Sequence, residues 1–213
     1  MLVIWYSVTM YFKIASLIGI GIIALLLWWV YSQPNSVTNY PSSRVTVVAF
    51  GDSLVSGVGS TDGQDFVSAL STQVGVPILN EGVAGNTTAD ALARVDDILA
   101  LNPKVVLVLF GGNDALQQVP ASETFANLGV LIETIHESGA MVVLLGVRGG
   151  LLRDEYGSQF EDLARTYNTA FVPDVLTGVF GRPALMSDPI HPNDAGYLII
   201  ANRVAPVLQP LLE

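Results

Sequence analysis

Cysteine is absent from this chain of 213 residues. Its absence excludes disulfides, thiolate metal sites, a thiol nucleophile and a lipidated cysteine. Basic residues are also scarce, with 9 Lys and Arg against 19 Asp and Glu and a formal net charge of -10. Because the chain has no Lys/Arg stripe that could neutralise phosphates, we expect no nucleic-acid partner. The acidic balance is typical of a solvated, soluble surface.

Several common functional motifs are also missing. Gly57-Val58-Gly59-Ser60 lacks the Gly-Lys-Ser/Thr ending of a phosphate-binding loop and does not match Gly-x-Gly-x-x-Gly. Ser53 is not surrounded by a Gly-x-Ser-x-Gly elbow, which argues against the α/β-hydrolase fold. The spacing of carboxylates and histidines does not suggest a metal site. We therefore expect neither a metal nor a cofactor.

Charged residues are missing from Ile14 to Tyr31. At about 1.5 Å per residue, a helix of this length nearly crosses a hydrocarbon core of about 30 Å. Aromatic residues gather at its C-terminal end, as at a membrane interface, and Lys13 flanks the other end. We therefore expect a cytoplasmic segment at 1–13, a transmembrane anchor at 14–31 and the remaining chain outside the cell membrane.

A cleaved signal peptide and a buried core helix are the alternatives to this anchor. Cleavage would leave a secreted or periplasmic protein. An Ala-x-Ala-like site does not follow the apolar run, and the run is long for a signal peptide, which favours an uncleaved anchor.

A further hypothesis is that translation starts at Met10, which would give a more ordinary charged N-terminal region. N-terminal sequencing that finds Met1 would contradict it.

The rest of the chain alternates between strand and helix patterns. Residues 32–43 are polar and read as a linker, and residues 44–213 fit one compact domain. Apolar β-branched runs predict parallel strands at 45–50, 76–80, 104–110, 140–147 and 170–173. Helical patterns occupy 64–74, 87–101, 121–138, 152–169 and 193–212. The alternation predicts a three-layer α/β/α sandwich with a flavodoxin-like parallel sheet of about five strands.

Ser53 lies just after the first predicted strand, and Asn113 lies just after the third. Functional residues of doubly wound sheets gather beyond the carboxyl ends of the strands. If the first and third strands are neighbours, both side chains therefore reach one crevice. A serine hydroxyl is a poor nucleophile at neutral pH, so Ser53 would need a base within hydrogen-bond reach.

His191 is the stronger of the two histidine candidates for that base. His136 falls inside the predicted helix 121–138, where we expect a surface or hydrogen-bonded histidine. Asp188 and His191 are each followed by a proline, which disfavours helical backbone, so one loop can aim both side chains into a cleft. Asp188 could then fix the imidazole tautomer. The alternative is an aspartate that caps a turn beside a merely polar histidine.

Acyl transfer also needs donors aimed at the developing oxyanion. Asn113 offers a side-chain amide, Gly85 an unobstructed backbone N–H, and Ser53 its own N–H. Gly111-Gly112-Asn113-Asp114 is equally typical of a sharp turn. We interpret Asp52 and Asp114 as carboxylates that bind backbone N–H groups two residues on.

Four motifs together resemble the SGNH (GDSL-type) hydrolase family, over about Val45 to Glu213. They are Gly51-Asp52-Ser53-Leu54, Asn80-Glu81-Gly82-Val83-Ala84-Gly85-Asn86-Thr87, Gly111-Gly112-Asn113-Asp114 and Asp188-Pro189-Ile190-His191-Pro192. The resemblance implies that Ser53 is the nucleophile, with Gly85 and Asn113 as oxyanion donors. It also implies that His191 is the base and Asp188 its partner.

In detail the chain is similar to bacterial arylesterases and multifunctional thioesterase/lysophospholipases, which usually carry a cleaved signal. This similarity implies a serine esterase for short acyl or aryl esters, acyl thioesters or lysophospholipids. One alternative is a deacetylase of acetylated envelope polysaccharide, and another is a module that binds an acyl or sugar ligand without catalysis. Arg148-Gly149-Gly150-Leu151-Leu152 follows the fourth strand and is either part of an acyl pocket or a surface loop.

Overall fold

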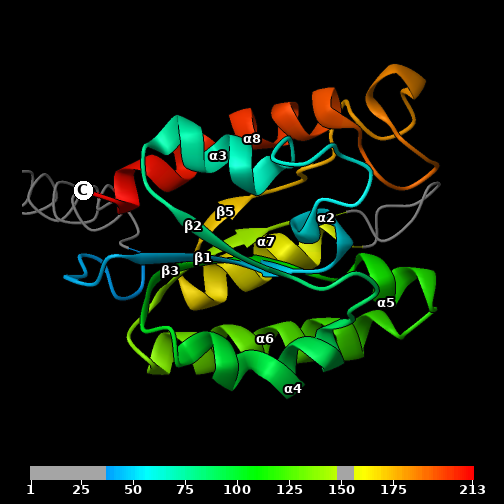
Figure 1. Cartoon of the computed structure of the whole chain (residues 1–213). Helices are drawn as coiled ribbons and strands as arrows, with labels where there is room; N and C mark the ends of the chain where they lie inside the picture. Colours follow the sequence, from blue (N-terminus) through cyan, green and yellow to red (C-terminus); the bar gives the residue numbers. More distant parts are fainter. Residues whose placement is uncertain (1–36, 148–155) are drawn as a thin grey trace, which may run out of the picture. The chain divides into compact units, whose positions relative to one another are not determined.

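The structure, a computed structural model, describes residues 37–147 and 156–213. These residues form a five-stranded parallel sheet in the order β2-β1-β3-β4-β5, with helices on both faces (Figure 1). The strands are β1 (Thr46–Gly51), β2 (Ile78–Gly82), β3 (Pro103–Leu109), β4 (Met141–Leu145) and β5 (Ala170–Val172). The predicted α/β class and the flavodoxin-like strand order are confirmed.

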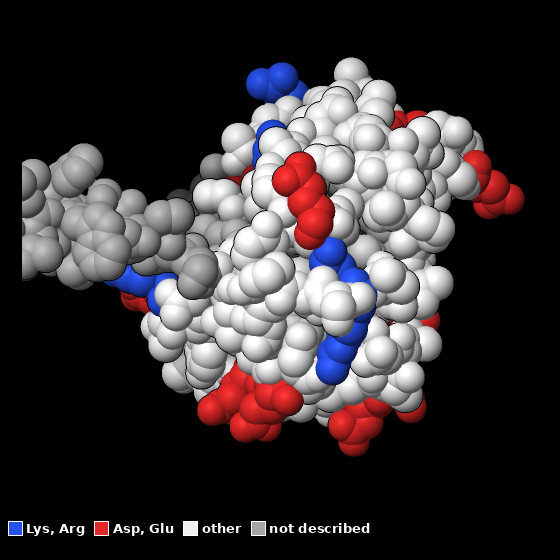
Figure 2. All heavy atoms as spheres, turned by 90° about the vertical axis from the view of Figure 1, so that its left-hand side faces the viewer, with Lys and Arg blue, Asp and Glu red and all other residues white. Residues whose placement is uncertain are grey.

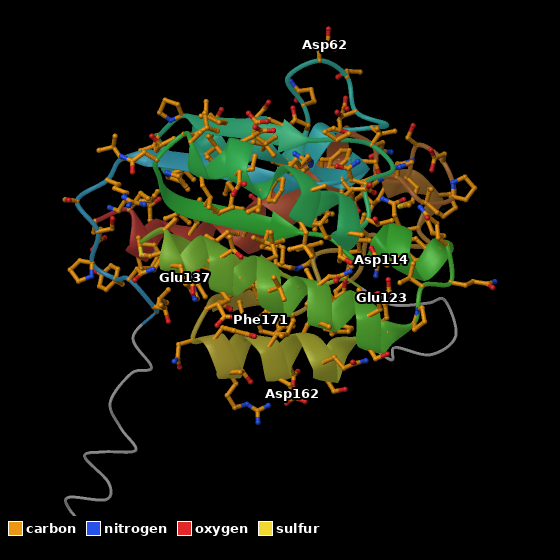
Figure 3. The ribbon with its side chains drawn as sticks, turned by 90° about the horizontal axis from the view of Figure 1, so that it is seen from below. Asp62, Asp114, Glu123, Glu137, Asp162 and Phe171 are labelled. Carbon is orange, nitrogen blue, oxygen red and sulfur yellow. The ribbon has the colours of Figure 1, made fainter. Side chains whose placement is uncertain are left out.

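Two layers of helices enclose the sheet. Helices α3 and α8 cover one face and α4, α6 and α7 the other, and Figure 3 shows α6 and α7 side by side. The helices are α2 (Ser53–Ser56), α3 (Phe66–Val74), α4 (Thr88–Leu99), α5 (Gly112–Leu116), α6 (Ala121–Glu137), α7 (Gly157–Tyr167) and α8 (Asp194–Leu208), with 3-10 turns at η1 (Pro183–Leu185) and η2 (Gln209–Leu211). Covered on both faces, every residue of β3 and β4 is buried. The sheet is therefore a rigid base for the loops at its edge.

The segments that follow β1 and β3 at the sheet edge are both short helices, so the sharp turn considered for Gly111-Gly112-Asn113-Asp114 is replaced by the start of a helix. Helix α2 begins directly after Asp52, whose side chain accepts a hydrogen bond from the N–H of Leu54, and it ends at Gly57 in the left-handed region. Helix α5 follows Gly111, which has φ 111°. These caps let the chain pass from strand β1 to helix α2, and from strand β3 to helix α5, within one or two residues.

Strand β2 starts two residues later than predicted and ends at Gly82. Pro77 directly precedes it and cannot donate a hydrogen bond to the neighbouring strand, which explains the later start. The shift also carries β2 further towards the edge where Ser53 lies, because Gly82 pairs with Gly51.

The predicted anchor at 14–31 and the segment at 1–13 lie outside the described residues. In the part of the chain that the structure describes, no helix is long and apolar enough to cross a bilayer. The part of the predicted linker that the structure describes is hydrogen-bonded to the rest of the domain. The N–H of Thr38 donates to the carbonyl of Asn168 at 3.0 Å, and Asn39 Nδ2 donates to the carbonyl of Ala140 at 2.9 Å.

Figure 2 shows the distribution of charge on one face of the molecule. Lys and Arg side chains form small separate groups on this face, and Asp and Glu cluster along its lower edge. The acidic residues seen on this face contribute to the acidic excess of the sequence, 19 Asp and Glu against 9 Lys and Arg.

Candidate active site

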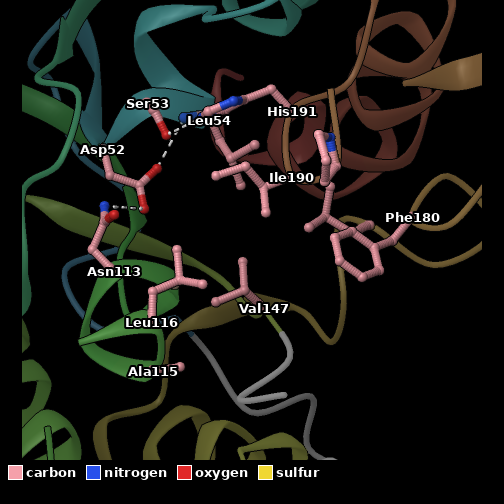
Figure 4. Close-up of a pocket in the computed structure, with 13 residues that line it drawn as sticks. Asp52, Ser53, Leu54, Asn113, Ala115, Leu116, Val147, Phe180, Ile190 and His191 are labelled. Carbon is pink, nitrogen blue, oxygen red and sulfur yellow. Dashed lines mark hydrogen bonds between the residues drawn. The ribbon is translucent and has the colours of Figure 1, made fainter. Parts of the chain in front are cut away.

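A chain of two hydrogen bonds joins Ser53, His191 and Asp188. Nε2 of His191 lies 3.0 Å from Oγ of Ser53, and Nδ1 lies 2.7 Å from Oδ2 of Asp188. Figure 4 shows Ser53 and His191 facing each other at the top of a cavity. The structure thus brings together the three side chains that the sequence singled out, although 138 positions separate Ser53 from His191.

The second oxygen of Asp188 shapes its own loop. Oδ1 accepts hydrogen bonds from the N–H groups of Ile190 at 2.8 Å and His191 at 2.7 Å. The bond from the His191 ring, followed by these two N–H donors, lowers the pKa of Asp188 to about 2. Asp188 is therefore ionised at neutral pH, and its carboxylate holds both the loop and the ring.

Gly59 lets the loop that carries His191 pack closely against the loop after α2. Gly59 has φ +95°, and a Cβ built on it would lie 2.6 Å from the carbonyl oxygen of Pro192 and 3.2 Å from Cβ of His191. Next to it, Oδ1 of Asp194 accepts from the N–H of Thr61 at 2.8 Å. The position of His191 relative to Ser53 therefore depends on this contact between two loops.

Substituting Gly59→Ala is expected to lower kcat by about 10- to 100-fold, because the new methyl group would push His191 away from Ser53. Gly63→Ala is the matched control. Gly63 also has a positive φ, +75°, but a Cβ there would meet nothing within 4 Å. Both variants should lose about 1–2 kcal/mol of unfolding free energy from backbone strain, with a further loss for Gly59→Ala. Equal kcat values for the two variants would contradict this explanation.

Asn113 and the turn at Gly85 and Asn86 meet beside Ser53. Nδ2 of Asn113 donates to the backbone carbonyl of Asn86 at 2.9 Å and to Oδ2 of Asp52 at a longer 3.4 Å. Gly85 has φ +85°, with open space around the position of a Cβ. Because β1 lies between β2 and β3, the three predicted oxyanion donors follow three adjacent strands.

Asp52 is buried next to the nucleophile, with 2% of its surface exposed. Burial raises its pKa to about 6, against the opposing effects of the N–H of Leu54 and the charge of His191. The prediction that Asp52 binds a backbone N–H two residues on is confirmed by the bond from Leu54 at 2.9 Å. Its second oxygen faces the amide of Asn113, a contact that the sequence did not predict.

Asp114 plays a different role from the one predicted. Instead of stabilising its own turn, the buried carboxylate accepts from the N–H of Thr88 at 3.0 Å and from its hydroxyl at 2.5 Å. Figure 3 labels Asp114 beside the start of α6, and Thr124 of that helix lies 3.5 Å away. Thr88 is the first residue of α4, so the Asp114 carboxylate of α5 joins the start of α4 to α5 through these bonds.

His136 lies on α6, in the helix where the sequence predicted it. The ring is half-buried, and within the described residues its Nε2 is buried without a hydrogen-bond partner. Burial lowers the pKa of His136 to about 4, so the ring is neutral at pH 7. In the described part of the chain, no group of three His, Asp or Glu side chains could hold a metal ion.

An apolar cavity of about 310 Å³ opens next to Ser53. Its described lining consists of Asp52, Ser53, Leu54, Gly112, Asn113, Ala115, Leu116, Val147, Leu176, Phe180, Pro189, Ile190 and His191. Figure 4 shows Leu116, Val147 and Phe180 on the side opposite the polar groups. The sequence did not predict Leu116 or Phe180, since Leu116 ends a helix of five residues and Phe180 lies in a turn, where apolar residues have no periodic signal. The segment from Arg148 to Leu152 lies outside the described residues.

The fold and these side chains are those of a serine ester hydrolase with an α/β/α architecture. The model of the GDSL-like Lipase/Acylhydrolase family matches residues 49–199, and the chain belongs to this family. It is a carboxylic ester hydrolase of the SGNH/GDSL type, as the resemblance implied.

Individual relatives align over most of their length. The chain is 32% identical over 182 residues to "Esterase TesA" of Pseudomonas aeruginosa, covering 78% of this chain and 89% of the relative. It is 27% identical to "Thioesterase 1/protease 1/lysophospholipase L1" of Escherichia coli, covering 79% and 85%. A crystal structure of TesA superposes with a TM-score of 0.70 at 30% identity, covering 78% of this chain and 99% of that one.

Proposed function

We propose that this protein hydrolyses esters and thioesters of apolar carboxylic acids through Ser53, His191 and Asp188. The proposal is carried by one observation: the hydrogen-bonded chain of these three side chains ends at the mouth of an apolar cavity. Ser53 supplies the nucleophile, and the cavity accepts the acyl group. The neutral hydroxyl needs the imidazole to remove its proton, and the carboxylate stabilises the imidazolium that forms.

The reaction proceeds in two halves. Oγ of Ser53 attacks the carbonyl carbon while Nε2 of His191 takes the hydroxyl proton. The tetrahedral intermediate collapses, the bond to the leaving alcohol or thiol breaks, and His191 gives its proton to that leaving group. Water then loses a proton to His191 and attacks the Ser53 acyl ester, and the returning proton restores the hydroxyl as the acid leaves.

The backbone N–H groups of Ser53 and Gly85 and the side-chain amide of Asn113 stabilise the oxyanion in this scheme. The amide of Asn113 has one short bond, to Asn86, and one long contact of 3.4 Å, to Asp52. The developing oxyanion replaces the long contact and leaves the short one in place, so Asn113 stays oriented during the reaction.

The cavity lining favours an acyl chain over an acetylated sugar. Opposite the catalytic groups the cavity presents the apolar side chains of Leu116, Val147 and Phe180, whereas a glycan would need polar groups to bind its hydroxyls. A volume of about 310 Å³ is far larger than an acetyl group requires. Medium-chain acyl groups, joined to an aryl alcohol, a thiol or a lysophospholipid glycerol, therefore fit the site better than acetate does.

A panel of p-nitrophenyl esters from acetate to dodecanoate tests this substrate class. We expect kcat/KM to rise about fourfold per methylene while the cavity fills, from about 0.8 kcal/mol per buried methylene. Acetate release from acetylated xylan should be slower than octanoate hydrolysis. A highest kcat/KM on acetyl esters would contradict the proposal and favour the polysaccharide deacetylase.

The variant Phe180→Ala links this preference to the cavity. Removing the ring makes room, so the ratio of kcat/KM for dodecanoate to that for hexanoate should rise about tenfold. Leu198→Ala is the control, since Leu198 is 49% exposed on α8 and is not part of the cavity lining. An unchanged ratio in Phe180→Ala would show that the acyl chain binds elsewhere.

A further inference from the structure

Arg94 of α4 binds three oxygen atoms at the edge of the sheet where Ser53 lies. Its Nη2 donates to the carbonyl of Gly51 at 2.9 Å, its Nη1 to the carbonyl of Glu81 at 3.1 Å, and its Nε to Oδ1 of Asn86 at 2.8 Å. All three acceptors are neutral, although a guanidinium binds carboxylates most strongly. The half-buried cation is thus used to hold main-chain and amide groups together.

Two of these acceptors, Gly51 and Asn86, lie close in sequence to proposed oxyanion donors. Gly51 ends β1 two residues before Ser53, and Asn86 directly follows Gly85. The backbone carbonyl of Asn86 in turn accepts the amide of Asn113 at 2.9 Å. A continuous path of hydrogen bonds therefore runs from Arg94 to the segments that carry all three donors.

Aromatic stacking fixes the plane of the guanidinium. The carbon Cζ of Arg94 lies 4.4 Å from the ring centroid of Phe50 and 5.9 Å from that of Phe110. These two rings pack edge to face at 5.0 Å at the ends of the neighbouring strands β1 and β3. Arg94 consequently contacts the ends of β1, β2 and β3 together, the three strands that precede the oxyanion donors.

We propose that Arg94 is a positioning residue that sets the spacing of the three oxyanion donors by holding the ends of β1, β2 and β3 in register. It acts through Gly51 and Asn86 and does not touch the substrate. This inference rests on the proposed function, because the donors matter only if an oxyanion forms next to Ser53. Substituting Arg94 should therefore destabilise the transition state more than the bound substrate. The reason is that the spacing of the oxyanion donors matters most when charge develops on the carbonyl oxygen.

The test measures kcat and KM on a p-nitrophenyl ester for Arg94→Met, which keeps the length and apolar stem of the side chain. We expect kcat to fall by about 100-fold while KM changes by less than about threefold, the pattern of a lost transition-state interaction. Arg94→Lys should lie between Arg94→Met and the wild type, because an ammonium cannot form the planar fork. The pH dependence of kcat/KM should keep its shape, because His191 is unchanged.

Chemical rescue separates positioning from folding. In Arg94→Ala, guanidinium at millimolar concentration should raise kcat about tenfold, while neutral urea of the same shape should not, because the site binds a planar cation. The control is Arg165→Met. Arg165 is exposed on α7 and pairs with Asp162 at 2.8 Å, so its loss should leave kcat, KM and rescue behaviour unchanged.

Two outcomes would overturn the inference. One is a kcat for Arg94→Met within about threefold of the wild-type value. The other is a loss in Arg94→Ala that follows thermal stability and is not restored by guanidinium. Failure of the proposed function has a different signature, because Ser53→Ala would then retain ester turnover whatever the Arg94 variants do.

Discussion

Replacing Ser53 with alanine is expected to lower kcat for p-nitrophenyl esters by on the order of 10⁵-fold, because the acyl-enzyme can no longer form. His191→Ala should cost a similar factor, since the hydroxyl keeps its proton without the imidazole 3.0 Å away. The double variant should be no slower than either single variant, because the two side chains act as one unit. Steady-state rates and covalent labelling with a fluorophosphonate probe measure these effects.

Ser56→Ala provides the matched control for Ser53→Ala. Ser56 is an exposed serine on the same short helix, and its hydroxyl donates to the carbonyl of Ser53 at 3.2 Å. This variant should keep its ester turnover and its labelling by the probe. Undiminished turnover in Ser53→Ala would falsify the assignment of the nucleophile. Absence of labelling in the wild-type protein would favour a module that binds a ligand without catalysis.

Asp188→Asn is expected to lower kcat by on the order of 10³- to 10⁴-fold through the wrong histidine tautomer. Two backbone N–H groups, from Ile190 and His191, donate to Oδ1 of Asp188, so an asparagine would place its oxygen there. Its amide nitrogen would then face Nδ1 of the ring and donate to it. The ring proton would move to Nε2, which could no longer accept the proton of Ser53.

The pH dependence of wild-type activity tests whether Asp188 loses its charge in the working range of pH. The pKa of Asp188 is lowered to about 2, so its carboxylate stays ionised from neutral pH down to about pH 3. Any loss of wild-type activity between pH 7 and about pH 4 should therefore not follow the titration of Asp188. Asp62→Asn is the control, because Asp62 lies at the tip of an exposed loop (Figure 3) and its change should leave kcat unaltered. Activity of Asp188→Asn within about tenfold of the wild type would contradict the tautomer argument.

The sheet and its order were predictable because buried parallel strands are continuous apolar runs with their own pattern. Apart from Lys104, the residues of β1 and β3 are mostly apolar without alternation, and Ser53 and Asn113 follow shortly after the two strands. Adjacency of the two strands then suffices to bring both side chains to one edge. Sequence patterns could therefore predict contacts between residues at the ends of adjacent strands, because the strand ends can be located from the sequence.

Arg94 was not predictable for the opposite reason. Asp90, Arg94 and Asp97 have the spacing of ion pairs along an exposed helix face, which predicts a solvated arginine. In the fold the guanidinium turns inward, towards carbonyl groups whose position depends on how α4 crosses the sheet. Asp114 is a similar case, since its partner Thr88 comes from a helix that is distant in sequence. Sequence patterns predict which residues are neighbours within one helix or strand, but they do not predict which residues of other elements come into contact when the chain folds.

Asp188 and His191 lie in one short loop, whereas Ser53, Gly85 and Asn113 are all attached to the sheet. The proposed catalytic residues therefore fall into two groups, one on the loop and one on the sheet. At the reacting atoms, one hydrogen bond, between Oγ of Ser53 and Nε2 of His191, joins the two groups. A small rigid displacement of the loop would uncouple the base from the nucleophile and leave the imidazole tautomer and the oxyanion donors intact.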